Sequence, residues 1–394
     1  MANNKNTKVP NVPNLRFPEF EGEWMESTIG KQFELYSGNT PSRLNKDYFK
    51  GEINWISSGE LKDHYIYSSK EKISQEASLN LKLLPAGTFI IAIYGLEAEG
   101  VRGTGSIIKE QSTISQACMA FSSIGEVENE FLYSWYKKHG NIIGLKYAQG
   151  TKQQNLSYDI LERFKIAYPS KQEQEKLYNF ISLLDERIAT QNKIIEKYES
   201  LIRGIVDAII LRKPQNAIIG DVCMISKQIR AESKIDDIIT VRLHGNGVCK
   251  SNAESLQLGA TQYYRRKAGQ LIYGKQNFHN GAIGIIPKAL DKGITSKDIP
   301  SFDIDNCKCN STYLLAQLLS PKFYKPSEAL TTGTGSKRLK EETFLKMPIV
   351  LPDKEEQDNI AVLIDKITMR LDQAKRMLYL FSAKKQYLLR QMFI

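Results

Sequence analysis

Hydrophobic residues recur every seven positions in two long segments of the chain. In the first segment, one row comprises Ile181, Ile188, Ile195, Ile202 and Ile209, and a neighbouring row comprises Leu184, Tyr198 and Ile205. In the second segment, the corresponding rows comprise Ile364, Leu371 and Leu378, and Ile367, Ala374, Phe381 and Leu388. This spacing predicts two long helices, each with an apolar seam that needs a partner helix.

Both predicted helices begin with the same polar signal. Ser170 precedes Glu173 by three positions, and Asp353 precedes Glu356 in the same way. In such a capping box, the two side chains bond backbone N–H groups that the helix start leaves free. The first helix ends before Pro214, because proline cannot continue it, and it is roughly 60 Å long at about 1.5 Å per residue. The second helix runs to the last residue of the sequence.

The two segments belong to one repeat of about half the chain. At a constant offset of 183 residues, identical residues pair without a gap: Gly150 with Gly333, Thr151 with Thr334, Leu156 with Leu339, Ile166 with Ile349, Pro169 with Pro352, Lys171 with Lys354, Glu173 with Glu356, and Gln174 with Gln357. Such a repeat indicates one module that occurs twice. We expect its two helices to pack as an antiparallel coiled coil, which relates the modules by a pseudo-two-fold axis.

A mixed α/β part precedes each helix. Short apolar runs between turn residues predict strands at 52–56, 87–94 and 164–168 in the first part, and at 237–242, 269–274, 283–286 and 347–351 in the second. A helix is expected near 130–140, and Trp55 and Trp135 are expected in the core. The predicted fold class is α+β, with a tail at 1–13, globular domains at 14–168 and 214–351, and long helices at 169–213 and 352–394.

Composition narrows the setting of the protein. No run of about twenty apolar residues could span a membrane, and the polar N-terminus lacks a secretory signal, so we expect a cytoplasmic protein. The five cysteines have no regular spacing, and no histidine lies beside the close pair Cys307 and Cys309, which favours reduced structural thiols over a metal site. The net charge of +10 favours a polyanionic partner without specifying one.

Several polar and basic segments have the chemistry of a DNA contact. The strongest are two glycine-rich loops at equivalent positions of the repeat, because glycine permits close backbone approach, amides suit adenine and arginine suits guanine. Their candidate contacts are Thr151, Lys152, Gln153 and Gln154, and Thr334, Ser336, Lys337 and Arg338. A turn with Asn39, Thr40, Ser42 and Arg43 suits a phosphate, and it is equally typical of a solvated turn.

The second part holds further candidate segments. A cluster of aromatic and basic residues suits a DNA backbone and is also typical of a strand edge: Tyr263, Tyr264, Arg265 and Arg266. Polar residues that follow predicted strands are weaker candidates: Arg242, His244, Asn246, Lys275 and Asn277. The four histidines are scattered, and the sequence contains no phosphate-binding loop, methyltransferase motif or nuclease-like carboxylate cluster. We therefore expect no catalytic site and no metal on this chain.

The N-terminal part carries residues that resemble a known family. These are the runs Val12 to Phe20, Thr28 to Gly30, Gly38 to Ser42 and Gly51 to Ile56, together with Trp24. With the two Pro-x-Lys-x-Glu-Gln helix starts and the heptad helices, nearly the whole chain resembles the specificity subunits of type I restriction–modification systems.

The resemblance implies that each globular part is a target-recognition domain for one half of a split site in double-stranded DNA. The helices would set the spacing between the half-sites and dock two methyltransferase (modification) subunits, and the full complex would recruit restriction subunits that translocate and cleave DNA. S-adenosylmethionine, ATP and Mg²⁺ would bind to those partners, with no cofactor on this chain. Two other interpretations stay open: a stand-alone DNA-binding regulator, and a coiled-coil scaffold with two protein-binding domains.

Overall fold

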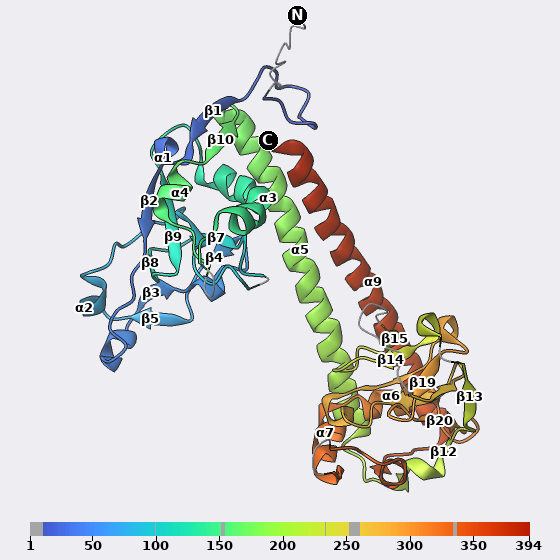
Figure 1. Cartoon of the computed structure of the whole chain (residues 1–394). Helices are drawn as coiled ribbons and strands as arrows, with labels where there is room; N and C mark the ends of the chain where they lie inside the picture. The colour runs from blue at the N-terminus through green and yellow to red at the C-terminus, as the bar shows by residue number, and fades with distance from the viewer. Residues whose placement is uncertain (1–10, 99, 151–153, 233, 252–260, 334–336) are drawn as a thin grey trace, which may run out of the picture. The chain divides into compact units, whose positions relative to one another are not determined.

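The chain divides into two compact units. The computed structural model describes residues 11–98, 100–150, 154–232, 234–251, 261–333 and 337–394. The first unit comprises Met1–Asn192 with Met377–Ile394, and the second comprises Lys193–Arg376. Each unit therefore combines one globular part with one segment of each long helix (Figure 1).

The globular part of the first unit is built on a five-stranded sheet. Its order is β2-β9-β6-β7-β4, with β2 at Phe33–Ser37, β9 at Cys118–Ser123, β6 at Phe89–Ala92, β7 at Gly105–Ile108 and β4 at Tyr65–Ile66. A three-stranded sheet has the order β5-β3-β8, with β5 at Glu71–Ile73, β3 at Ile53–Ile56 and β8 at Ser112–Ile114. A separate antiparallel pair joins β1 at Met25–Thr28 to β10 at Lys165–Tyr168.

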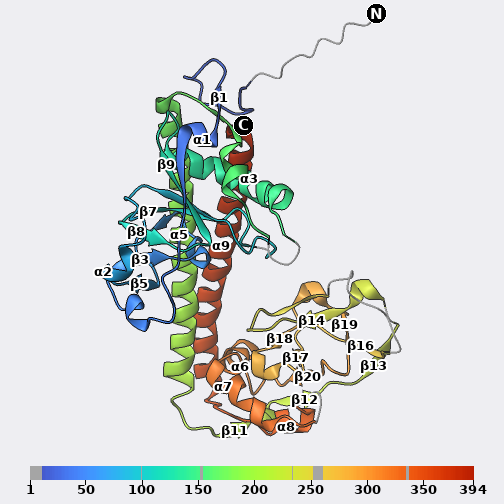
Figure 2. The ribbon, with the colours of Figure 1, turned by 60° about the vertical axis from the view of Figure 1, so that its left-hand side comes forward.

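Helix α3, at Asn129–Tyr147, packs on the five-stranded sheet (Figure 2). Its side chain Tyr136 is buried, with its ring 5.8 Å from that of Phe89 in β6. The prediction of a helix near 130–140 is confirmed, and Trp55 and Trp135 are core residues as expected. The shorter elements are α1 at Ile29–Gln32, α2 at Gln75–Ser78, α4 at Tyr158–Glu162, η1 at Lys46–Phe49 and η2 at Ser58–Glu60.

The globular part of the second unit has a four-stranded antiparallel sheet. Its order is β12-β20-β17-β18, with β12 at Cys223–Ile225, β20 at Ser301–Ile304, β17 at Leu271–Tyr273 and β18 at Ile283–Ile285. A three-stranded sheet, β13-β16-β19, comprises β13 at Ile229–Ala231, β16 at Tyr263–Arg265 and β19 at Ile294–Ser296. Two further pairs join β14 at Ile239–Val241 to β15 at Val248–Lys250, and β11 at Ala217–Ile218 to β21 at Pro348–Ile349.

Short helices surround these sheets. They are α6 at Ser311–Leu318, α7 at Pro321–Tyr324, α8 at Glu341–Leu345, η4 at Ile219–Asp221, η5 at Ile235–Asp237, η7 at Phe278–Asn280, η8 at Lys288–Leu290 and η9 at Lys325–Leu330. The core is aromatic, because the ring of Tyr273 in β17 lies 4.7 Å from that of Phe344 in α8 and 5.8 Å from that of Phe302 in β20. Mixed sheets and helices in both units confirm the predicted α+β class.

The two predicted long helices are α5 at Lys171–Ile205 and α9 at Lys354–Met392. Their starts are capped, since Ser170 Oγ accepts from the Glu173 N–H at 3.4 Å and Asp353 Oδ1 accepts from the Glu356 N–H at 2.8 Å. The glutamates themselves bind cations from preceding segments: Glu173 pairs with Arg16 at 2.7 Å, and Glu356 pairs with Lys213. The caps therefore have the predicted first half of a capping box, and a tertiary ion pair takes up the second residue.

Within each unit, the two helix segments run in opposite directions. In the second unit, Glu199 of α5 pairs with Lys375 of α9 at 3.0 Å, whereas Lys213, later in the chain, pairs with the earlier Glu356. In the first unit, the early part of α5 lies beside the late part of α9, where Asp185 pairs with Lys385 (Figure 1). This is the antiparallel coiled coil that the seam pattern predicts.

The predicted seam residues lie between the helices or against the adjoining core. Buried members are Ile181, Leu184 and Leu388 in the first unit and Ile364, Ile367 and Leu371 in the second. Half-buried members are Ile188, Leu378 and Phe381 in the first unit and Ile195, Tyr198 and Ile202 in the second. In the described ranges no helix is long and apolar enough to cross a bilayer.

The first row ends earlier than the sequence predicts. Residues Val206–Ile210 form a π-helical turn, η3, directly after α5. A π turn holds an extra residue, so the seven-residue register shifts by one. Ile210 is consequently fully buried, while Ile209 is 37% exposed. The expected place of Ile209 in the seam is wrong for this reason.

Candidate nucleic-acid interface

The two glycine-rich loops are equivalent hairpins. In the first unit, the backbones of Gln149 and Asn155 exchange two hydrogen bonds of 2.9 Å. In the second unit, Thr332 and Arg338 do the same at 3.0 and 2.9 Å, again at an offset of 183 residues. The glycine after the first bridge residue has φ 115° in one hairpin and 128° in the other, a conformation that L side chains rarely adopt.

The hairpin tips fall outside the described residues. Thr151, Lys152 and Gln153 of the first tip, and Thr334 and Ser336 of the second, are therefore not placed. Gln154, Lys337 and Arg338 belong to the described stems, with Gln154 half-buried and the other two exposed. The predicted DNA contacts of these loops stay a prediction.

Each hairpin is anchored beside the end of a central strand. The N–H of buried Leu156 donates to the carbonyl of Ile93 after β6, and the N–H of buried Leu339 donates to the carbonyl of Lys275 after β17, both at 2.9 Å. A buried leucine in each stem thus fixes the loop at the same edge of both globular parts. The repeat therefore presents one exposed polar loop twice, on a rigid support.

In the second unit, this anchor brings several candidate residues together. Arg338 forms an ion pair with Asp298 at 3.3 Å, and Asp298 also accepts the backbone N–H of Lys275 through its carbonyl, at 2.9 Å. The Lys275 ammonium pairs with Glu341 at 2.7 Å and is largely buried, so it is less available for DNA than Arg338. The Lys275 and Arg338 segments form one continuous surface with the exposed Lys337.

The strand pair β14 and β15 contributes its tip to the same region. Arg242, His244 and Asn246 are all exposed there. The backbone N–H of His244 donates to the Asn280 carbonyl at 2.8 Å, which joins the tip to the turn that holds the exposed Asn277. His244 has φ 58°, a left-handed conformation that keeps its side chain at the tip. Three separate predicted segments therefore converge in the second unit.

In the first unit, the turn with Asn39, Thr40, Ser42 and Arg43 is folded onto the three-stranded sheet. The Asn39 carbonyl accepts from the Trp55 indole N–H at 3.1 Å, and Asn39 Oδ1 accepts from the Thr40 N–H at 2.8 Å. The Arg43 guanidinium donates two hydrogen bonds to Glu71, at 2.6 and 2.8 Å. A DNA phosphate would compete with Glu71 for Arg43, while Asn39 and Ser42 are exposed.

The aromatic and basic cluster is mostly part of the core, which corrects the sequence prediction. β16 is the middle strand of its sheet, so Tyr263 and Tyr264 are buried. Arg266 is 1% exposed, donates to Thr295 Oγ1 at 2.7 Å and Ser301 Oγ at 2.8 Å, and burial lowers its pKa to about 10. These three side chains cannot reach a duplex as folded. Of the cluster, Arg265 remains exposed.

Two buried glutamines, which the sequence marked as repeat matches without a role, hold each globular part on its helix. Gln174 Oε1 accepts from the Glu128 N–H at 3.0 Å, and its amide donates to the carbonyls of Glu126 and Pro169 at 3.0 and 2.9 Å. Gln357 makes the same three bonds, listed here in the same order: Asn310 N–H at 2.9 Å, Lys308 carbonyl at 3.0 Å, Pro352 carbonyl at 2.9 Å. Both glutamines are fully buried. Their identity at the repeat offset was the available signal.

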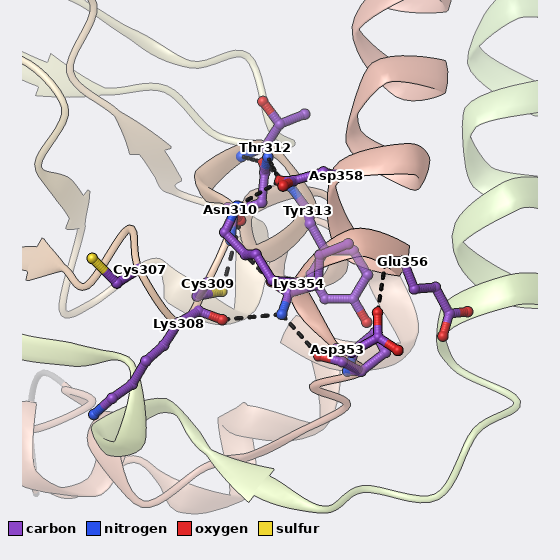
Figure 3. Close-up of polar contacts among 12 residues, drawn as sticks. Cys307, Lys308, Cys309, Asn310, Thr312, Tyr313, Asp353, Lys354, Glu356 and Asp358 are labelled. Atoms are coloured by element: carbon purple, nitrogen blue, oxygen red, sulfur yellow. Dashed lines mark hydrogen bonds and ion pairs between the residues drawn. The ribbon is translucent and has the colours of Figure 1, made fainter.

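The surroundings of Gln357 add further polar contacts (Figure 3). The Asn310 amide donates to Asp358 of α9 at 2.7 Å, and Lys354 pairs with the same carboxylate at 2.6 Å. The hydrogen bond from Lys354 is the largest cause that holds the pKa of Asp358 below its ordinary value. The loop before α6 is thus fastened to the first two turns of α9.

In the first unit, a charged junction does the corresponding work. The His64 ring stacks between two tyrosine rings at 4.0 and 3.9 Å. Its Nε2 lies 3.0 Å from Glu130 of α3, and its Nδ1 lies 3.4 Å from Asp185 of α5, which also pairs with Lys385 of α9. Burial raises the pKa of Asp185, but its contacts with His64 and Lys385 outweigh this and leave the pKa below its ordinary value.

The cysteines are free thiols. Cys118, Cys223 and Cys309 are buried, and burial raises the pKa of each thiol to about 12, so these groups stay protonated and unreactive. Cys307 is exposed, and Cys249 accepts a hydrogen bond from Arg242 at 3.1 Å. Within the described ranges, no three His, Cys, Asp or Glu side chains form a group that could hold a metal ion.

A repeated module with polar loops at one edge and a long helix at its end defines a class of two-headed recognition proteins. A family model described as the type I restriction modification DNA specificity domain matches residues 21–200 and again residues 217–377. The two matches cover well over half of the chain. The chain therefore belongs to this family and contains two copies of its domain.

Curated relatives and solved structures agree with this assignment. The MjaIX specificity subunit of a type I restriction enzyme from Methanocaldococcus jannaschii is 31% identical over 186 residues, which is 44% of this chain and 41% of that protein. The MjaVIII specificity subunit from the same organism is 20% identical over 381 residues, 88% of this chain and 86% of that protein. The crystal structure of the type I S subunit from M. genitalium has a similar fold, with a TM-score of 0.65 at 15% identity, covering 97% of this chain and 99% of that one.

Proposed function

We propose that this chain is the DNA specificity subunit of a type I restriction–modification complex. Each globular part would read one half of a bipartite target in double-stranded DNA. The observation that carries the proposal is the pair of equivalent hairpins, Gln149–Asn155 and Thr332–Arg338, set at the same edge of two similar scaffolds. The family's description as a DNA specificity domain supports the same role.

The two heads would read different sequences, because the residues around the hairpins differ. The first hairpin has amides in its stem, with Gln154 N–H bonded to the Glu97 carboxylate at 2.9 Å. The second has Lys337 and Arg338 in its stem. Amides suit adenine and arginine suits guanine in the major groove, so a different composition selects different bases.

We further propose that the chain is not itself an enzyme. Methylation and cleavage would belong to two methyltransferase subunits and to restriction subunits, which would also hold S-adenosylmethionine, ATP and Mg²⁺. The complex would work in the cytoplasm, where its DNA lies. The outer faces of the long helices suit such partners, since Leu183 and Leu201 of α5 and Leu363, Met369 and Leu380 of α9 are exposed apolar residues.

The decisive experiment is methylome sequencing of a host that expresses this chain with its modification subunits. A bipartite methylated motif that disappears when this chain is removed supports the proposal. A gel shift with and without a methyltransferase subunit separates the alternatives. Tight sequence-specific binding by the chain alone would instead indicate a stand-alone regulator, and no binding in any combination would indicate a protein scaffold.

The helix pair would act as the ruler between the half-sites. Seven residues add about 10 Å to a helix, which corresponds to about three base pairs of duplex. Inserting one heptad after Glu196 in α5 and one after Arg376 in α9 keeps both seams in register. The methylated half-sites should keep their sequences while the gap between them changes. An unchanged gap in the methylome would show that the helices do not measure the distance.

A further inference from the structure

The two globular parts differ in charge. Residues 14–168 contain 17 Lys and Arg against 19 Asp and Glu, a net charge of −2. Residues 214–351 contain 19 Lys and Arg against 12 Asp and Glu, a net charge of +7. The segments 169–213 and 352–394 carry only +1 and +2. Most of the chain's excess of +10 therefore belongs to the second globular part.

Ion pairing widens this difference. In the first part, many cations face a carboxylate of the same part: Arg43 with Glu71, Lys50 with Asp47, Lys72 with Glu52, Lys82 with Glu34, Lys109 with Glu130, Lys165 with Glu26. In the second part, Arg230, Arg265, Lys297 and Lys337 are exposed and form no ion pair with any described residue. These side chains are free to meet a negatively charged partner.

The equivalent hairpins show the same contrast locally. In the first unit, the carboxylate of Glu97 binds the hairpin backbone at Gln154, and this hydrogen bond is the largest cause that lowers the pKa of Glu97, so the negative charge is held at the loop. In the second unit, the hairpin stem carries Lys337 and Arg338, and Lys297 lies next to Asp298, the partner of Arg338. At the same place in the repeat, one loop is acidic and the other is basic.

A duplex responds to this difference before any base is read. DNA carries a dense row of phosphates, and each phosphate that a cation neutralises releases a condensed counterion. A part with net charge +7 attracts the duplex over about a Debye length, roughly 10 Å at 0.1 M salt, whereas a part with net charge −2 does not. The acidic part gains free energy only from short-range contacts, once it has been brought onto its half-site.

We propose that the second globular part supplies the sequence-independent grip on DNA and that the first part adds little to it. The inference rests on the proposed function of the chain. It assigns the two heads different tasks: the second holds the duplex during the search, and the first completes recognition when its half-site arrives. The salt dependence of binding is then a property of one half of the molecule.

Matched charge variants test this division. In the full chain bound to its modification subunits, Lys297→Gln with Lys337→Gln removes two exposed cations from the second part. Lys31→Gln with Lys62→Gln removes two exposed cations from the first part. Affinity for a duplex that lacks both half-sites is measured by fluorescence anisotropy over a range of salt concentrations, with unfolding midpoints to verify that both variants fold.

The second-part variant should weaken binding and reduce the slope of log K against log salt by about 0.9 per lost phosphate contact, up to about 1.8 for two. The first-part variant should leave the slope unchanged. Equal changes in both variants, or a larger change in the first-part variant, would overturn the inference. The methylome of the wild-type complex keeps the two proposals apart: a bipartite motif with equal slopes refutes the division of tasks alone, and the absence of a motif refutes the specificity function.

Discussion

Replacing Gln357 with methionine removes three hydrogen bonds at a fully buried position. Methionine has nearly the same length and volume as glutamine, so the packing around the start of α9 changes little. The Asn310 N–H and the carbonyls of Lys308 and Pro352 each lose their partner. These groups belong to the loop before α6 and to the residue that precedes the α9 cap, so the damage falls on the attachment of the globular part to its helix.

The expected loss of stability follows from these three groups. A buried donor or acceptor that loses its partner costs about 1–3 kcal/mol. The bonded atoms lie close to partly exposed residues, so water can reach them in the variant, and the lower value applies to each. The substitution Gln357→Met should therefore lower the free energy of unfolding by about 3 kcal/mol, or the unfolding midpoint by about 6–12 °C in a domain of this size.

Urea and thermal unfolding of the full chain, followed by circular dichroism, measure this loss. Gln386→Met is the matched control, because Gln386 lies on the same helix and is exposed. Gln174→Met should reproduce the loss in the first unit, since Gln174 makes the equivalent three bonds. A change for Gln357→Met below about 0.5 kcal/mol, equal to that of the control, would refute the claim that this glutamine holds the domain on its helix.

Further substitutions test the first unit. Lys385→Met should destabilise it by about 3 kcal/mol, because Asp185 then stays buried without its ammonium partner, and Asp185→Asn added to it should restore part of the loss in a double-mutant cycle; additive effects would show that the two groups do not interact. Burial lowers the pKa of His139 from 6.5 to about 4. The unfolded chain therefore binds a proton that the folded chain does not, and stability should fall as the pH decreases from about 6.5 to 4. His139→Gln should flatten this part of the urea-unfolding profile, whereas His244→Asn, at an exposed position, should not; the same pH slope in both variants would assign the effect to other groups.

Local patterns in the sequence were sufficient for the helices and for the repeat. The seven-residue spacing predicted α5 and α9 because a helix returns to the same face about every seven residues, whatever surrounds it. The caps at Ser170 and Asp353 were predicted for the same reason, since a capping residue acts within one turn. The offset of 183 residues also indicated that the two hairpins are equivalent, and the structure gives both the same backbone bonds.

The exposure of the candidate contacts could not be predicted in this way. Tyr263, Tyr264 and Arg266 have the composition of a DNA-binding cluster, but β13 and β19 flank β16 on both sides and bury them. Strand order depends on which distant segments pair, and no local pattern contains that information. Likewise, the π turn that exposes Ile209 and buries Ile210 depends on how the end of α5 packs against α6 and α9.

The sequence by itself determined the duplicated module, its two long amphipathic helices and the family to which it belongs. These features depend on periodicity and on identity at a fixed offset, which a linear chain displays directly. Only the tertiary structure decided which cations are free, which are paired with carboxylates, and which polar groups hold each domain on its helix. Those properties depend on contacts between residues far apart in the chain, such as Arg16 with Glu173 or Asn310 with Gln357, and such contacts exist only once the chain is folded.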